Sequence, residues 1–347
     1  MCLASFSTGT YCQEGLQNLD DFCMIDTHLK FYRKSEVILT KKRNKSFWSW
    51  IVLIVAVIVA AALHSMPSAQ EGEEKTNSSP SSSEILNVYY LDVGQGDSEL
   101  IELPNGQTML IDAGNPENGG QINHFLEEQD IDTIDYLVAT HPHADHIGGM
   151  AEVVSAVEIG SVYMPKVSTT SKTFENLLST ISQEGLSIKT AKAGVELFHQ
   201  DDLKAVMVAP VGSKYSDLNQ YSAVIKLTYG NTSFLFTGDA GEESEKEITA
   251  DVSADVLKVG HHGSDTSSTQ AFLNRVSPKY AVIEVGKDNT YGHPAESTLK
   301  KLEQMGTKIY RTDEDGTILF QSDGTNITVK THISGMEAQD SSMKSAA

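Results

Sequence analysis

Three histidines and one aspartate lie within six consecutive residues of this 347-residue chain: His141, His143, Asp145 and His146. Imidazole and carboxylate groups are ligands of zinc, manganese and iron, so the cluster predicts a metal site without naming the metal. The apolar run 134–139 before it predicts a buried strand. The ligands are therefore expected at the C-terminal end of a strand, where the first two histidines can face one ion and the other two residues a second. A polar loop with unrelated histidines is the alternative interpretation.

The spacing HxHxDH after a strand resembles the metal motif of the metallo-β-lactamase superfamily. The resemblance covers residues 85–329 and includes the sequence Tyr-Gly-His-Pro at 291–294. With that sequence, the chain is similar to one branch, the hydrolase domain of ComEC-type DNA-uptake proteins and its stand-alone relatives. The other matching segments follow the order that the superfamily uses: 91–98, 110–114, 236–239 and 257–264. The resemblance implies an αββα four-layer sandwich that binds two divalent metal ions, zinc or manganese.

Two of these segments supply further metal ligands under the same resemblance. Asp239 ends an apolar strand, and a carboxylate there can bridge two cations; from the sequence alone, it could equally cap the helix that follows. Of the pair His261 and His262, the first is the expected ligand, and the second is expected to contact a ligand or a phosphate. Asp112 ends another strand and is expected to orient the metal loop by hydrogen bonds.

The resemblance also implies catalytic and substrate-binding residues. The predicted catalytic residues are Asp145, which also binds metal, His262 and His293, and either histidine could protonate a leaving oxygen. Capping of the next helix is the alternative role of His293. Asp97 ends a glycine-rich turn that predicts a tight hairpin or a phosphate cradle, and the resemblance directs its carboxylate toward the metals. Ser264 is a further candidate for contact with the substrate or for support of the ligands.

One departure from the superfamily pattern concerns a third histidine for the site of His141 and His143. Many members place it between the HxHxDH loop and the later aspartate, but the only histidine in this interval is His199, in a stretch that predicts a surface turn. The equivalent position is expected at Asn219 or Ser222. Their oxygens are harder and weaker ligands than imidazole, which would favour manganese or a loosely held second zinc.

The elements that must position these residues alternate between strands and helices in two halves. Many of the strands are continuous apolar runs, as expected for sheets covered on both faces. Strands are predicted at 85–92, 98–103, 107–112, 134–139, 203–208, 222–229, 232–237, 254–259, 280–285 and 307–311. Helices are predicted near 120–128, 147–157, 241–249, 269–275 and 295–303.

The first 84 residues have another character. Residues 51–63 are apolar without interruption, and with the aromatic residues from Phe47 onward the run reaches about 17 residues, the lower end of what spans a bilayer. Lysines and an arginine precede it and acidic residues follow, so the positive-inside rule predicts a cytoplasmic N-terminus and an exported domain. A cleaved signal peptide, which would make the domain secreted, is the first alternative, and a buried core helix is the second.

The expected organisation is therefore one hydrolase domain behind a membrane anchor. It comprises a cytoplasmic segment (1–46), a transmembrane helix or signal anchor (47–64), a flexible linker (65–84), the hydrolase domain (85–334) and a disordered tail (335–347). All three cysteines precede the apolar run, so the exported domain can form no disulfide and offers no thiolate to a metal.

Charge bears on the substrate. After residue 50 the chain has 19 Lys and Arg against 42 Asp and Glu, which repels polyanions at long range. Tight non-specific DNA binding depends on phosphate contacts from basic side chains, so this balance disfavours it. A local basic groove remains an alternative, with these candidates: Lys166, Lys172, Lys189, Lys192, Lys204 and Lys214.

Together these features predict an extracellular, membrane-tethered, metal-dependent hydrolase, with a phosphodiesterase or DNase activity as the leading interpretation. Bound metals would polarise a phosphoryl oxygen and generate hydroxide from water near neutral pH. The resemblance points to DNA as the phosphodiester, whereas the acidic composition favours a small cell-wall phosphodiester. A non-catalytic, metal-dependent domain that binds or senses anions is the alternative from another class. β-Lactam hydrolysis is disfavoured by the missing histidine.

Overall fold

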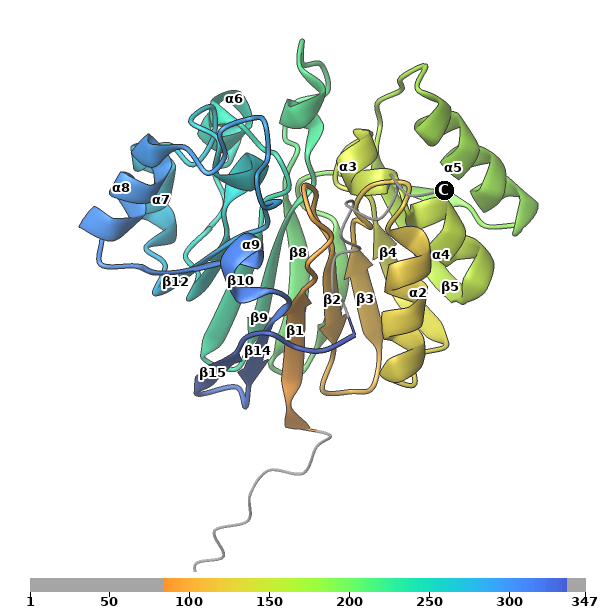
Figure 1. Ribbon diagram of the computed structural model, residues 1–347, viewed down its shortest axis with the longest axis horizontal. Helices are drawn as coiled ribbons and strands as arrows, with labels where there is room; N and C mark the ends of the chain where they lie inside the picture. Colours follow the sequence, from red (N-terminus) through yellow and green to blue (C-terminus); the bar gives the residue numbers. More distant parts are fainter. Residues whose placement is uncertain (1–83, 336–347) are drawn as a thin grey trace, which may run out of the picture. The chain divides into compact units, whose positions relative to one another are not determined.

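Two β-sheets packed face to face, with helices outside each, make up the part of the chain that the computed structural model describes, residues 84–335 (Figure 1). The predicted anchor at 47–64, the segments on either side of it up to residue 83 and the tail after residue 335 lie outside the described residues. Within the described part, no helix is both long enough and apolar enough to cross a membrane.

The first sheet is 8-stranded, in the order β15-β14-β1-β2-β3-β4-β5-β6. Its strands are β1 (Leu86–Tyr90), β2 (Glu99–Glu102), β3 (Thr108–Ile111), β4 (Thr133–Val138), β5 (Glu158–Pro165), β6 (Ile188–Ala191), β14 (Ile318–Ser322) and β15 (Ile327–Lys330). The strands from β3 to β6 are parallel, and the other pairs are antiparallel.

The second sheet is 7-stranded, in the order β13-β12-β11-β10-β9-β8-β7. Its strands are β7 (Glu196–Gln200), β8 (Leu203–Ala209), β9 (Val224–Tyr229), β10 (Thr232–Phe236), β11 (Val256–Lys258), β12 (Tyr280–Ile283) and β13 (Lys308–Arg311). The strands from β10 to β13 are parallel. Parallel strands end at the same edge of a sheet, which matters for the site described below.

The strands build the core because successive side chains point to opposite faces. In β10, Phe234 and Phe236 pack between the sheets, whereas Leu235 packs under the helices of the second sheet. In β1, Tyr90 lies between the sheets and Tyr89 under the helices of the first sheet. Both faces of each sheet are thus buried, which explains the continuous apolar runs in the sequence.

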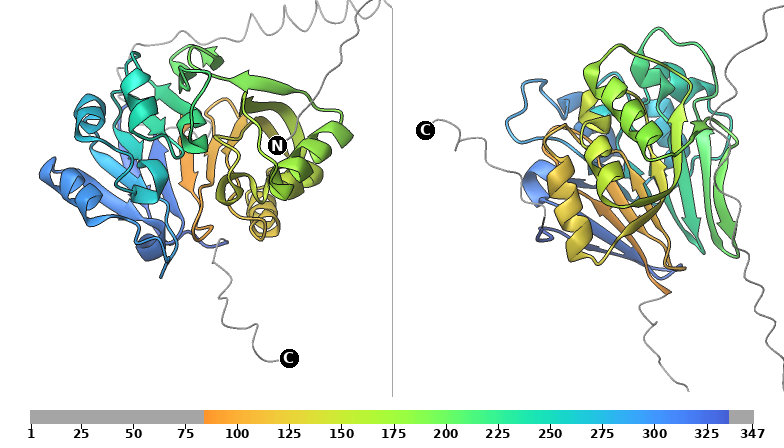
Figure 2. Two further views of the ribbon diagram at one scale, coloured as in Figure 1. Left: turned by 90° about the horizontal axis from the view of Figure 1, so that it is seen from above. Right: turned by 90° about the vertical axis from the view of Figure 1, so that its right-hand side faces the viewer.

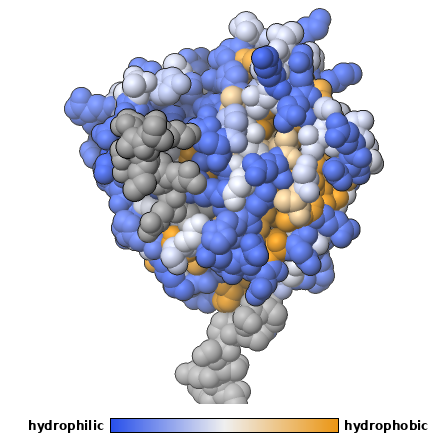
Figure 3. All heavy atoms as spheres, turned by 45° about the vertical axis from the view of Figure 1, so that its right-hand side comes forward, coloured by the Kyte–Doolittle hydropathy of each residue, from blue (hydrophilic) through white to orange (hydrophobic). Residues whose placement is uncertain are grey.

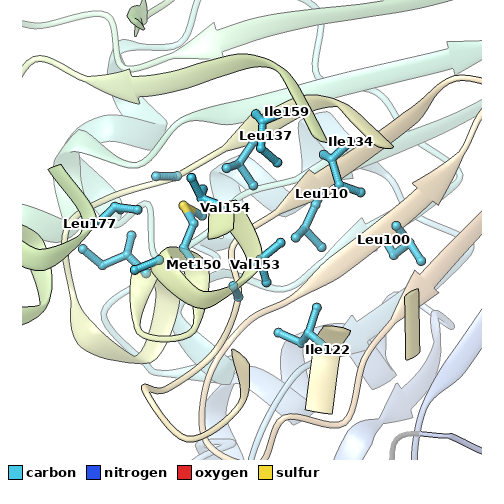
Figure 4. Packing of buried hydrophobic residues seen from close by; sticks show 14 of the residues in the cluster. Leu100, Leu110, Ile122, Ile134, Leu137, Met150, Val153, Val154, Ile159 and Leu177 are labelled. Carbon is cyan, nitrogen blue, oxygen red and sulfur yellow. The ribbon is translucent and has the colours of Figure 1, made fainter. Parts of the chain in front are cut away.

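Helices cover the two outer faces, as the view from above in Figure 2 shows. The first sheet carries α2 (Gly119–Glu128), α4 (Met150–Ala156) and α5 (Lys172–Gln183), and the second carries α6 (Glu242–Glu247), α7 (Gln270–Val276) and α8 (Glu296–Gln304). Figure 4 shows Ile122 of α2 and Val153 of α4 beside strand residues such as Leu110 and Leu137. Burial of each such side chain contributes roughly 1.5–3 kcal/mol. The four layers confirm the predicted αββα sandwich.

Two predictions about single elements differ from the structure. Residues 195–202 do not form only a surface turn, because β7 pairs with β8 as an edge strand that buries Leu197 and exposes His199. The helix predicted near 147–157 is present as α4 but begins later, at Met150, and a separate helix, α3 (Ala144–Ile147), precedes it. Gly148 and Gly149 lie between the two helices, and the position of Gly149 requires glycine because a Cβ there would lie 2.5 Å from the carbonyl oxygen of Ala113. β5, β6, β14, β15 and α5 were not predicted.

Candidate metal centre

The predicted ligands meet where parallel strands of both sheets end, near α3 in Figure 1. β3 ends next to Asp112, β4 leads to the HxHxDH motif, and β10 leads to Asp239. β11 leads to His261 and His262, within the 3-10 turn η3 (Gly260–Gly263). Crevices at the carboxyl ends of parallel strands are the usual ligand sites of α/β folds. The topology therefore brings together residues that are more than 100 positions apart.

Asp239 lies at the middle of this cluster, and its two oxygens face different histidines. Oδ1 is 3.3 Å from Nε2 of His146 and 3.8 Å from Nε2 of His262. Oδ2 is 3.7 Å from Nε2 of His141 and 3.6 Å from Nε2 of His261. The alternative role as a helix cap does not apply, because α6 begins after Gly241 and has no side-chain cap. The arrangement is that of a carboxylate between two ligand sets.

The first ligand set, called the His146 site below, consists of Asp145, His146, His262 and Oδ1 of Asp239. Asp145 Oδ2 is 3.3 Å from Nε2 of His262 and 3.9 Å from Nε2 of His146. Four ligands at about 2.1 Å from a tetrahedral zinc are about 3.4 Å apart, close to these separations. Nε2 of His146 and Oδ1 of Asp239 are buried with no hydrogen-bond partner. Such atoms need a partner, so these residues fit a divalent cation.

The second set, called the His141 site, consists of His141, His143, His261 and Oδ2 of Asp239. Nε2 of His141 is 3.0 Å from Nδ1 of His143. Compact three-residue groups that could hold a metal include His146 with Asp145 and His262, but none among the described residues contains His143 or His261. The His141 site is therefore more open than the His146 site.

From the sequence, His261 is the expected ligand of the pair, and His262 is expected to contact a ligand or a phosphate. Both imidazoles approach Asp239, each from the side of a different oxygen, and His262 lies nearer the other ligands of its site. Both residues have φ of 52°, in the left-handed region, which is strained for residues other than glycine. This unusual turn directs two consecutive side chains into the centre, and it places His261 on the side that lacks the third histidine of the superfamily.

The two candidates for replacing that histidine differ in position. Ser222 Oγ is 3.3 Å from Nδ1 of His141 and accepts a hydrogen bond from the amide of Asp239, so it contacts the ring edge opposite Nε2. Asn219, in the 3-10 turn η2 (Leu218–Tyr221), has its amide nitrogen 3.5 Å from the ring of His261 and a buried Oδ1 without a partner. Of the two, only Asn219 offers a free oxygen beside the His141 site.

A family model described as the metallo-beta-lactamase superfamily matches residues 91–286. This chain belongs to that superfamily. It is 31% identical over 254 residues to ComE operon protein 3 of Bacillus subtilis, covering 67% of this chain and 33% of that protein. It is 28% identical over 291 residues to competence protein ComA of Neisseria gonorrhoeae, covering 82% and 37%. The chain thus spans about a third of the length of these relatives.

Among solved structures, the metallo-beta-lactamase fold protein YhfI from Bacillus subtilis covers 71% of this chain and 99% of its own, with a TM-score of 0.44 and 11% identity.

Behind the ligands of this metallo-β-lactamase domain, hydrogen bonds fix the imidazole rings. Asp112 accepts from Nδ1 of His146 at 2.8 Å and from the amide and hydroxyl of Thr140 at 2.8 and 2.6 Å. Nδ1 of His262 is 3.0 Å from the carbonyl oxygen of Glu284 and 3.1 Å from Oδ1 of Asp97. These contacts hold each Nε2 toward the centre and raise its basicity as a ligand. Asp97 thus faces the metal histidines from behind.

Lys258 is a residue of this support that sequence analysis missed. Its side chain is fully buried, and Nζ donates to Oδ2 of Asp97 and, at 3.3 Å, to the carbonyl oxygen of Gly238. Burial raises the pKa of a carboxyl, but the ammonium group of Lys258 and the nearby His262 hold the pKa of Asp97 below its usual range. The signal was a lysine within the apolar strand β11, where a charge needs a buried partner.

The electrostatics of the His146 site favour positive charge, whereas burial lowers the pKa of His141 and of His261 at the other site. Burial would lower the pKa of His262, but the carboxylates of Asp239 and Asp97 outweigh it and raise this pKa to about 9. The pKa of His146 is raised for the same reason, by Asp239, Asp97 and Asp112. Protons on these rings occupy the place that a divalent cation would take, and a metal must displace them.

His293 and Ser264 lie at the margin of the centre. The ring centroid of His293 is 5.5 Å from that of His261 and 6.3 Å from that of His262, and its Nδ1 is buried without a partner. Ser264 Oγ is 3.0 Å from the hydroxyl of Thr266, which in turn is 3.1 Å from Nδ1 of His261. His293 therefore lies beside His261 and His262, and Ser264 is linked to His261 through the hydroxyl of Thr266.

Proposed function

We propose that this hydrolase-family domain is a metal-dependent phosphodiesterase that uses two metal ions. The observation that carries the proposal is Asp239, whose two oxygens each face a separate pair of imidazoles. Pairs of metals held about 3.5–4 Å apart are typical of enzymes that displace phosphate esters, because they bind the attacking and the leaving oxygen at once. The similarity to competence proteins supports a phosphodiester over a lactam.

The roles of the residues follow from their positions. Asp145, His146, His262 and Asp239 would hold one ion, and His141, His143, Asp239 and His261 the other, with Asn219 beside it. When bound, the ions supply a hydroxide nucleophile and stabilise charge on the phosphoryl oxygens. The ring of His293 is half-exposed beside His261 and His262, so it can contact the substrate. Burial and these two neighbouring rings lower the pKa of His293, which favours a substrate contact over donation of a proton.

A small diester is a second candidate for the substrate. The acidic composition disfavours a long polyanion, and two of the candidate lysines have partners within the domain: Lys204 of β8 pairs with Glu196 at 3.0 Å, and Lys189 of β6 donates to the hydroxyl of Ser161 at 2.9 Å. A short nucleotide and a cell-wall diester are both small enough to bind without an extended basic surface. The test below therefore includes both a DNA strand and a small ester.

Metal content and turnover should be measured together on the purified full-length chain. Bound metal should first be removed, and zinc and manganese should then be added separately. Hydrolysis of bis(p-nitrophenyl) phosphate and of single-stranded DNA should be measured with each metal. His141→Ala and Asp145→Ala should lower both metal content and turnover, whereas His332→Ala, at an exposed position outside the centre, should change neither. Bound metal without turnover of any diester would favour the anion-binding alternative.

We also propose that the domain is outside the cell, tethered by residues 47–64. The proposal rests on the basic residues before the apolar run and the acidic residues after it. Protease added to intact cells should digest the domain. Digestion only after lysis would contradict the proposed topology without affecting the proposed chemistry.

A further inference from the structure

One aromatic side chain is exposed next to the metal centre. Tyr291 is 71% exposed, more than the other exposed large hydrophobic residues of the described chain, Ile188 at 41% and Val211 at 49%. The face of the domain in Figure 3 is mostly hydrophilic, with hydrophobic residues gathered in a band. Single exposed hydrophobic residues are common and need no explanation by themselves. The surroundings of Tyr291 supply the further observations.

The ring of Tyr291 is the outermost of a series of rings that leads to the metal ligands. Its centroid is 5.8 Å from that of His293, with the planes 22° apart. His293 in turn is stacked on His262 at 6.3 Å and lies edge-on to His261 at 5.5 Å. Tyr291 is therefore separated by the single ring of His293 from the two histidines that face Asp239.

The backbone of the loop that carries Tyr291 is fixed by several hydrogen bonds. Asn289 Oδ1 accepts from the amides of Tyr291 and His293 at 3.2 and 3.1 Å, and its Nδ2 donates to the carbonyl oxygens of Gly286 and His293 at 3.1 and 2.6 Å. The amide of Gly286 donates to Gln95 Oε1 at 3.1 Å, which ties the loop to the first sheet's glycine-rich turn. Such preorganisation lowers the entropy lost when a ligand binds.

We propose that Tyr291 is a stacking subsite for the base of a nucleotide phosphodiester whose phosphate lies at the metal centre. The inference rests on the proposed phosphodiesterase function and narrows its substrate. An exposed aromatic face binds unpaired bases by stacking, which contributes about 1–3 kcal/mol per base whatever the sequence. Stacking needs no basic groove, so it is compatible with the acidic composition. A glycerol or ribitol phosphodiester has no planar ring to place there.

The test compares a diester that has bases with one that has none. The full-length chain with both metals should be assayed on thymidylyl-(3′→5′)-thymidine and on glycerophosphoglycerol. Tyr291→Ala should raise KM for the dinucleotide about 10- to 100-fold with little change in kcat, and should leave the glycerol diester unaffected. Tyr291→Phe keeps the aromatic face and should retain the wild-type KM. Ile188→Ala, on the edge strand β6, is the control for loss of an exposed hydrophobic side chain.

Three outcomes separate the inference from the function on which it rests. Equal effects of Tyr291→Ala on both diesters, or no effect on either, would overturn the subsite and leave the phosphodiesterase standing. If the wild-type protein cleaves the glycerol diester but not the dinucleotide, the subsite is likewise overturned and the phosphodiesterase function stands. If neither diester is cleaved, the proposed function fails. Calorimetry with thymidine 5′-monophosphate and glycerol 3-phosphate then tests the subsite separately. The subsite predicts that Tyr291→Ala binds thymidine 5′-monophosphate more weakly than the wild type does and binds glycerol 3-phosphate equally well.

Discussion

The two halves of the metal centre share Asp239 but differ in what lies behind their histidines. At the His146 site, Nδ1 of His146 meets the Asp112 carboxylate, and Nδ1 of His262 meets Asp97 and a backbone carbonyl. At the His141 site, the groups behind the rings are hydroxyls: Thr140 at 3.1 Å and Ser222 at 3.3 Å from His141, and Thr266 at 3.1 Å from His261. One site is supported by charge, the other by neutral dipoles.

This difference predicts unequal affinity for metal. A carboxylate behind an imidazole orients it and makes it a better ligand, and loss of such a partner typically costs 10- to 100-fold in metal affinity. Asp145, His146 and His262 of the His146 site also offer ligand atoms within 4.8 Å of one another, whereas His143 and His261 belong to no compact group in the described chain. We therefore expect the His146 site to fill first and the His141 site to depend on added metal.

The largest effect is expected from the residue that the two sites share. Asp239→Ala removes one ligand from each, and the loss of transition-state stabilisation by the metals should lower diester turnover by about a thousandfold or more. Metal analysis should show that both ions are lost. Retention of one tightly bound ion would mean that one site is complete without Asp239.

The next largest effect should come from the support of the His146 site. Lys258→Met removes the ammonium group that pairs with the buried carboxylate of Asp97, and breaking a buried pair in this way typically costs 3–5 kcal/mol. Denaturant unfolding of the metal-free protein measures it. Lys279→Met is the matched control, because Lys279 pairs with Asp255 at 2.8 Å but is 73% exposed, and such pairs contribute about 0–1 kcal/mol. Equal losses in the two variants would show that the Lys258 pair adds no more than a surface one.

Substitution of the two neighbouring histidines should then separate the sites. His262→Ala should weaken the tightly bound metal by at least about 100-fold, since it removes a ligand and not only a supporting group. His261→Ala should weaken only the second, loosely bound ion. Metal titration by calorimetry distinguishes the two variants, and loss of the same ion in both would contradict the division into two sites.

The sequence predicts the parts of the centre that depend on neighbouring residues in the chain. The HxHxDH motif, Asp112 and Asp239 all follow apolar strands, and the strand pattern from 85 to 139 is reproduced by β1 to β4. The division of labour between His261 and His262 could not be predicted, because it depends on a left-handed turn that both residues adopt. Lys258 was missed because its partner Asp97 comes from the other sheet, and pairing across sheets leaves no periodic signal.

The smallest predicted effect concerns pH and the metal-free protein. The pKa of His262 is raised to about 9 in the folded state, against about 6.5 in the unfolded chain, so its proton stabilises the fold fully below pH 6.5 and less as pH rises through 9. Burial lowers the pKa of His141, so its contribution to the stability of the fold changes in the opposite sense. That change takes place at pH values below about 6.5, outside the range in which His262 titrates. The melting temperature of the metal-free domain should therefore fall by a few degrees between pH 6.5 and 9. His262→Gln should reduce this fall without abolishing it, because the pKa of His146 is raised as well. Zinc-loaded protein should not show the fall, because the metal has replaced the proton and binds more tightly as pH rises. A metal-free melting temperature that rises over this range would mean that the imidazoles of the His146 site are neutral before metal binds, and that its carboxylates do not favour positive charge.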